Sequence, residues 1–151
     1  MFSIDAIMSS NLVTVPPSAT LAEARTLMQD NSIHHLPVTD DGGIVGLVTI
    51  TNVLAATDSF LRDDRHRIHA NEIIVGDVMV KDVATVDVNA SLRQAALFLE
   101  RHQIGCLPVM EDGKLVGIIT ETDFVAVAIN LLEQIESTEP VGDDFDDLDV
   151  A

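Results

Sequence analysis

The chain has 151 residues, of which 47% are hydrophobic and only 3% aromatic, so its length suits one domain with an aliphatic core. Its 25 acidic residues against 8 lysines and arginines give a formal net charge of −17, which argues against nucleic-acid binding because phosphates are repelled. No apolar run is long enough to span a membrane, the N-terminus lacks a secretory-signal pattern, and the single Cys106 cannot form an internal disulfide, so we expect a cytoplasmic protein without membrane contact.

Each half of the chain is expected to follow the order β-α-β-β-α, described here for the first half. A short strand over residues 12–15 is followed by a helix that begins with a capping box at Thr20. Two strands, over residues 33–38 and 44–48, flank an Asp-Gly hairpin turn, and a second helix begins at Thr51. A proline within the first strand of this hairpin suits a sheet edge or a strand end.

The second half repeats these elements without a gap at an offset of 71 residues. Residues 7–54 and 78–125 are identical at 16 of 48 positions, and the identical pairs include turn, core and polar residues. This pattern indicates a duplicated supersecondary unit. We therefore expect the following segments: a first repeat over 3–57, a connector over 58–73, a second repeat over 74–133, and an acidic, disordered tail over 134–151.

This ordered set of motifs resembles the cystathionine β-synthase (CBS) domain family, here as a tandem pair, which is also called a Bateman module. The resemblance rests on the Ile-Met or Val-Met opening, the Leu-Pro-Val strand, the Asp-Gly turn, and the segments 46–52 and 117–123. It implies an α+β fold in which two β-α-β-β-α repeats pack with pseudo-twofold symmetry as one module. It also implies a homodimer and two clefts between the sheets, which in this family often hold adenosine-containing ligands.

The junctions between the last strand and the last helix carry the candidate binding chemistry. Thr49 and Asn52 in the first repeat correspond to Thr120 and Asp123 in the second. Free N–H groups at a helix start attract anions, and a carboxylate can accept two hydrogen bonds from a ribose diol. Alternatively, these side chains only cap their helices. By resemblance, Asp123 binds ribose and Thr120 contacts ribose or phosphate, and the neutral Asn52 should serve less well.

The resemblance also implies the opposite side of the Asp123 cleft. Its other wall would come from the first strand of the other repeat, and basic or polar side chains would reach the phosphates. The candidate residues are Ser10, Asn11, Leu12, Val13, His34 and His35. The two histidines could instead be half-buried strand residues with backbone partners. Gly105 and Cys106 replace them in the second repeat, so phosphate contacts would be one-sided.

The sequence shows no P-loop, no paired His–carboxylate site and no triad spacing, so we expect a regulatory module that is not an enzyme and has no cofactor. The expected ligand is an adenine nucleotide, AMP, ADP or ATP, ahead of S-adenosylmethionine and NAD, and the expected partner is an unknown effector protein or enzyme acting in trans. Two alternatives remain, a constitutive homodimeric scaffold with empty clefts and a metal-dependent enzyme built from the histidines. The connector is rich in Arg and His, and could be either a solvated helix end or a patch that faces phosphate or the dimer partner.

Overall fold

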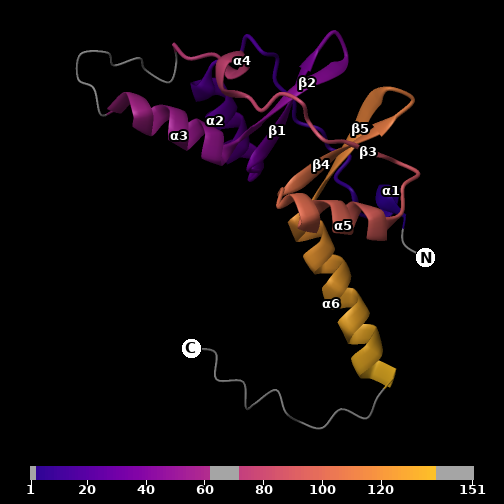
Figure 1. Cartoon of the computed structure of the whole chain (residues 1–151). Coiled ribbons are helices and arrows are strands. Elements are labelled where there is room, and N and C mark those ends of the chain that lie inside the picture. Colours follow the sequence, from indigo (N-terminus) through magenta and orange to yellow (C-terminus); the bar gives the residue numbers. More distant parts are fainter. Residues whose placement is uncertain (1–2, 62–71, 139–151) are drawn as a thin grey trace, which may run out of the picture.

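The computed structural model describes residues 3–61, the first half of the molecule, and residues 72–138, the second half; Figure 1 shows the halves side by side. The first half contains α1 (Ile4–Ile7), α2 (Leu21–Asn31), β1 (His35–Asp40), β2 (Gly43–Thr49) and α3 (Ile50–Leu61). The second contains α4 (Val75–Val78), β3 (Val86–Asp87), α5 (Leu92–His102), β4 (Cys106–Glu111), β5 (Lys114–Thr120) and α6 (Glu121–Thr138). The fold is therefore α+β with two repeats, as expected.

Two expected segments fall largely outside this description. The Arg- and His-rich part of the connector (Arg62, Arg65, His66, Arg67 and His69) and most of the acidic tail, residues 139–151, lie outside the described residues. Their expected roles therefore stay predictions, but the disorder expected from residue 134 onward is wrong for residues 134–138, which form the end of α6.

Capping boxes fix the starts of α2 and α5, as predicted. The backbone N–H of Glu23 donates to Thr20 Oγ1 at 3.1 Å, and that of Thr20 donates back to Glu23 Oε2 at 3.2 Å. Ser91 and Gln94 make the same reciprocal pair at 3.0 and 3.1 Å. Each pair satisfies two N–H groups that the first helical turn leaves free, which sets where the helix begins.

The two hairpins also form where the Asp-Gly pairs predict them. Asp41 and Gly42 between β1 and β2 have φ angles of 49° and 79°, and Asp112 and Gly113 between β4 and β5 have 50° and 77°. Two successive positive φ angles match the twist of the adjoining strands, and glycine adopts them without strain. These tight turns therefore set the antiparallel register of both strand pairs.

The edge or strand-end position predicted for the hairpin prolines is wrong for Pro108, whereas Pro37 lies in β1, an outer strand of the two-stranded sheet β1-β2. Pro108 belongs to β4, the middle strand of the sheet β3-β4-β5, and Pro37 pairs with Leu47 inside the β1–β2 ladder. The N–H and C=O of Leu47 bond instead to Val80, at 3.0 and 2.8 Å. The Pro37–Leu47 pair thus carries no hydrogen bond, so the missing proline donor removes no rung from this ladder.

The opening strands are much shorter than predicted. Val15 forms only an isolated parallel bridge with Val38, and β3 has two residues. Pro16 and Pro17 follow Val15 directly and have no N–H to extend the pairing. Just before this stretch, Ser9 pairs with Ile118 of the second half instead of continuing along its own sheet.

The two halves exchange their opening segments, which the sequence did not predict. Ile4 is fully buried in the core of the second half, whereas Ile73 and Val75 are buried in the core of the first. Met8 covers Gly117 and Met79 covers Gly46, where a side chain on the glycine would collide with the methionine sulfur. The room left by these glycines is therefore occupied by the other half, and each core is completed by residues from outside its own repeat.

Candidate functional site

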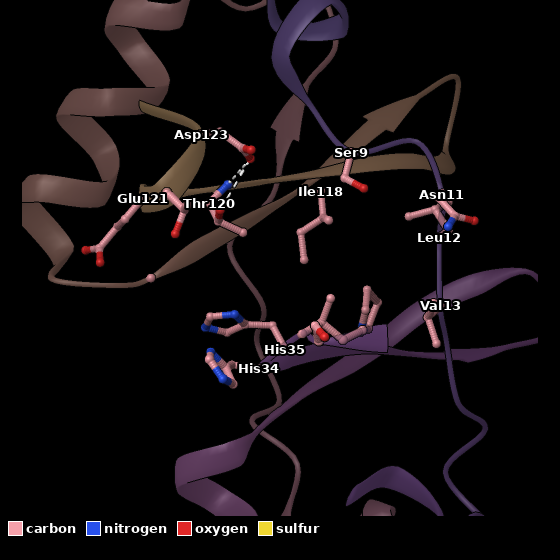
Figure 2. A pocket seen from close by; sticks show the side chains of 15 residues that line it. Ser9, Asn11, Leu12, Val13, His34, His35, Ile118, Thr120, Glu121 and Asp123 are labelled. Atoms are coloured by element: carbon pink, nitrogen blue, oxygen red, sulfur yellow. Dashed lines mark hydrogen bonds between the residues drawn. The ribbon is translucent and has the colours of Figure 1, made fainter. Parts of the chain in front are cut away.

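Two clefts lie where the halves meet, and the larger is built around the β5–α6 junction. This first cleft has a volume of about 500 Å³. Figure 2 shows its walls, formed by the junction with Thr120 and Asp123, by the start of β1 with His34 and His35, and by the opening segment 9–13. The walls thus come from both halves, so a molecule held there would touch both.

Asp123 is held in place by the threonine before the helix. Its Oδ2 accepts hydrogen bonds from the backbone N–H of Thr120 at 2.8 Å and from Thr120 Oγ1 at 3.3 Å. Within the described part of the chain Oδ1 has no hydrogen-bond partner, so one carboxylate oxygen is available to a ligand. The capping geometry and a binding role are therefore compatible in one side chain.

Asn52 makes the matching contacts in the first half. Its Oδ1 accepts hydrogen bonds from the backbone N–H and the hydroxyl of Thr49 at 3.0 and 2.8 Å. The backbone N–H of Asn52 donates to Thr49 Oγ1 at 3.2 Å. Asn52 is not among the residues that line either cleft, whereas Thr49 lines the second one. The amide is thus engaged at the start of α3.

The structure brings most of the predicted site residues together in the first cleft. Its lining includes Asn11, Leu12, Val13, His34, His35, Thr120 and Asp123. Ser10 is not part of this lining, and its neighbour Ser9 takes its place, because a change of one residue along an extended segment reverses the direction of the side chain. Glu121, Ile118 and Gly105 also line the cleft and were not predicted.

The imidazole of His35 separates the first cleft from the second. A Cβ built on Gly105 would lie 3.1 Å from His35 Nε2, and both residues line both clefts. Burial, together with the neighbouring His34, lowers the pKa of His35 from 6.5, and Glu121 opposes this only in part. His35 is therefore a neutral ring at pH 7 and a weak partner for phosphate.

The second cleft, about 460 Å³, is the pseudosymmetric counterpart of the first and is largely apolar. Its lining includes Leu47, Val80, Val83, Ala84, Phe98, Ile104 and Cys106. Asp82 is its carboxylate, and His35 and His102 are its imidazoles. The rings of Phe98 and His102 lie 4.2 Å apart. Burial raises the pKa of the Cys106 thiol to about 12, so this sulfur is a protonated, small apolar group at neutral pH.

Neither a metal centre nor a membrane span is found in the described ranges. Within residues 3–61 and 72–138, no three His, Cys, Asp or Glu side chains cluster in a way that could hold a metal ion. In the same ranges, no helix has the length and apolar character needed to cross a bilayer.

Comparison of the sequence with known families and curated proteins shows where this architecture recurs. The family model for the CBS domain matches residues 4–59 and again residues 75–130. A CBS domain-containing protein of Dictyostelium discoideum is 33% identical over 138 residues, which cover 85% of this chain and 92% of that protein. The CBS domain-containing protein YhcV of Bacillus subtilis is 29% identical over 123 residues, 82% of this chain and 83% of YhcV.

Solved structures share the fold over most of the chain. The crystal structure of a putative acetoin utilization protein (AcuB) from Vibrio cholerae has a TM-score of 0.76 and 38% identity, and the match covers 93% of this chain and 99% of that one. The structure of CBSX2 in complex with AMP has a TM-score of 0.73 and 29% identity, with coverages of 87% and 99%.

Proposed function

Because this chain belongs to the CBS domain family as a tandem pair, we propose that it is a regulatory module that binds an adenosine-containing ligand in the first cleft. The observation that carries the proposal is Asp123, which Thr120 holds by one carboxylate oxygen, while the other oxygen has no hydrogen-bond partner among the described residues. The relative CBSX2 was crystallised with AMP, which supports an adenosine-containing ligand here.

The first cleft offers complementary groups to each part of an adenosine. Leu12, Val13 and Ile118 supply aliphatic surface for the base, whose polar edge would bond to backbone groups of the opening segment. The free oxygen of Asp123 would accept a hydrogen bond from the ribose diol. In the second cleft the counterpart of Asp123 is Asn52, an amide that does not line the cleft, and the carboxylate that does line it, Asp82, belongs to the opening segment instead. We therefore propose that the first cleft is the principal site.

Binding there would be passed on as a change in how the halves pack. The ligand would touch β1 and the β5–α6 junction at once, so it would favour one relative placement of the two halves over others. We propose that this placement is sensed by an effector protein or enzyme in trans.

Helix α6 offers a surface through which two copies could pair. Val125, Ile129, Leu132 and Ile135 are each more than half exposed, and Figure 1 shows the helix extending away from the rest of the second half. Exposed apolar side chains on one helix favour burial against a partner. We propose a homodimer that uses α6, to be tested by sedimentation velocity of Ile129→Glu, which should dissociate it, with Asn130→Glu as the control that should not.

Thermal unfolding with adenosine tests the ligand proposal. A ligand at 100 times its dissociation constant adds about 2.7 kcal/mol to the free energy of unfolding. For a chain of this length this raises Tm by roughly 5–10 °C. The increase should vanish in Asp123→Ala and persist in the matched control Asn52→Ala.

Each variant is compared with its own ligand-free Tm, because both substitutions also remove contacts at a helix start. No increase with adenosine, AMP, ATP, NAD or S-adenosylmethionine would overturn the proposal and favour the scaffold with empty clefts. An increase that survives in Asp123→Ala would place the ligand elsewhere.

A further inference from the structure

The ionisable groups of the first cleft are unusual for a site that would bind nucleotides. Its described lining carries two carboxylates, Glu121 and Asp123, and two histidines, but no lysine or arginine. The whole chain adds to this with a formal charge of −17. The cleft is therefore acidic where a phosphate-binding site would normally be basic.

The two carboxylates at the β5–α6 junction have no counterpart at the β2–α3 junction, and the second cleft has Asp82 as its one lining carboxylate. Glu121, the first residue of α6, corresponds to Ile50 at the start of α3, just as Asp123 corresponds to Asn52. The first turn of α6 thus holds two acidic residues, whereas that of α3 holds none. The partial positive charge at the N-terminus of α6 could otherwise attract a phosphate, but the negative charges of Glu121 and Asp123 already offset it.

Glu121 lies on the side of the cleft that the 5′ group of an adenosine would reach. In Figure 2, Asn11, Leu12 and Val13 stand at one end of the cleft, whereas Glu121 is at the other, nearer to His34 and His35. With the base at the aliphatic end and the ribose at Asp123, the 5′ substituent points toward Glu121. The influence of Glu121 on the pKa of His35 indicates that its charge acts within this end of the cleft.

We propose that the first cleft prefers adenosine compounds whose 5′ group is uncharged or positively charged, such as a thioether or a sulfonium, and disfavours 5′-phosphates, with Glu121 as the residue that sets this preference. The inference rests on the proposed function, and it reverses the order of ligands expected from the sequence.

Two electrostatic effects give the proposal measurable consequences. Removing one unit charge several ångströms from a phosphate, at a partly solvated site, changes affinity by roughly tenfold. Salt screens repulsion as well as attraction, so added salt should strengthen phosphate binding here. A phosphate site built from lysine and arginine would show the opposite salt dependence.

Isothermal titration calorimetry on the full chain tests the preference, at pH 7.5 with EDTA so that no divalent cation bridges phosphate and carboxylate. The probes are adenosine, 5′-methylthioadenosine, S-adenosylmethionine, AMP and ATP. In the wild type, affinity should fall by about tenfold or more from adenosine to ATP. Glu121→Gln should strengthen ATP binding by about tenfold, weaken S-adenosylmethionine and leave adenosine within about twofold. Glu136→Gln, which removes the same charge at the far end of α6, should change none of these.

The failure of this inference can be distinguished from that of the proposed function. ATP that binds the wild type as tightly as adenosine, or a ratio of ATP to adenosine affinity that Glu121→Gln leaves unchanged, would overturn the charge preference while an adenosine site still stands. Failure of all five compounds to bind would overturn the proposed function itself.

Discussion

Gly117→Ala tests whether the exchanged opening segments hold the two halves together. A Cβ at this position would lie 2.9 Å from Met8 Cγ and 3.1 Å from the carbonyl oxygen of Ser9, and closer still to the Met8 sulfur. Overpacking of this kind costs about 1–3 kcal/mol, and alanine regains about 0.4–1 kcal/mol by restricting the unfolded chain. We expect a net loss of about 1–2 kcal/mol, which lowers Tm by roughly 2–8 °C.

Circular dichroism at 222 nm during thermal unfolding measures this loss, with Gly43→Ala as the control. A Cβ on Gly43 would lie 3.7 Å from its nearest neighbour, the carbonyl oxygen of Asp40, so this variant should be as stable as the wild type or slightly more stable. In the double variant Gly117→Ala with Met8→Ala the collision with the methionine disappears and only the contact with the Ser9 carbonyl remains, so the two losses should not add. A stable Gly117→Ala protein, or strictly additive losses, would refute the packing argument.

Three further predictions concern residues other than Glu121 and Asp123. The pKa of His35 in the folded protein lies below 6.5, so the unfolded chain takes up the proton first and the free energy of unfolding falls as pH drops below about 6.5. The Tm of His35→Asn should therefore fall less between pH 7.5 and 5.5 than the Tm of the wild type. Equal decreases in Tm would contradict this. The thiol pKa of Cys106 is raised to about 12, so in the folded protein at pH 8 this residue should react with iodoacetamide at least about 100-fold more slowly than in the unfolded protein. Mass spectrometry measures both rates, and equal rates would be inconsistent with the burial of Cys106. Thr20→Ala should lower the free energy of unfolding by about 1 kcal/mol in urea titrations because α2 loses its capping box, and an unchanged midpoint would argue against that role.

The local elements of this fold could be predicted because their signals lie within a few residues. Thr20 and Ser91 begin helices through contacts three positions along the chain, and Asp-Gly pairs form turns through their own φ angles. The exchange of opening segments could not be predicted in this way. Met8 meets Gly117, and nothing in the periodicity of either segment says which half it will join.

The candidate site was predictable where the two repeats could be compared. The difference between Asn52 and Asp123 pointed to the first cleft, and the structure places Asp123 there. The difference between Ile50 and Glu121, two positions earlier, is a signal of the same kind and indicates Glu121 as a further residue of the first cleft. Ser10 was predicted in place of Ser9 because sequence alone does not fix which residues of a short extended segment face a cleft.

The exchange of opening segments also sets an order of events during synthesis. The first core takes Ile73, Val75, Val78 and Met79 from beyond its own repeat, so it can close soon after residue 79 has left the ribosome. Ile4 and Met8 are made before all of these, yet their partners in the second core include Leu107 of β4 and Ile119 of β5. Of the two opening segments, the one translated earlier is therefore buried later, and Ile4 stays without its core until β4 and β5 have been made.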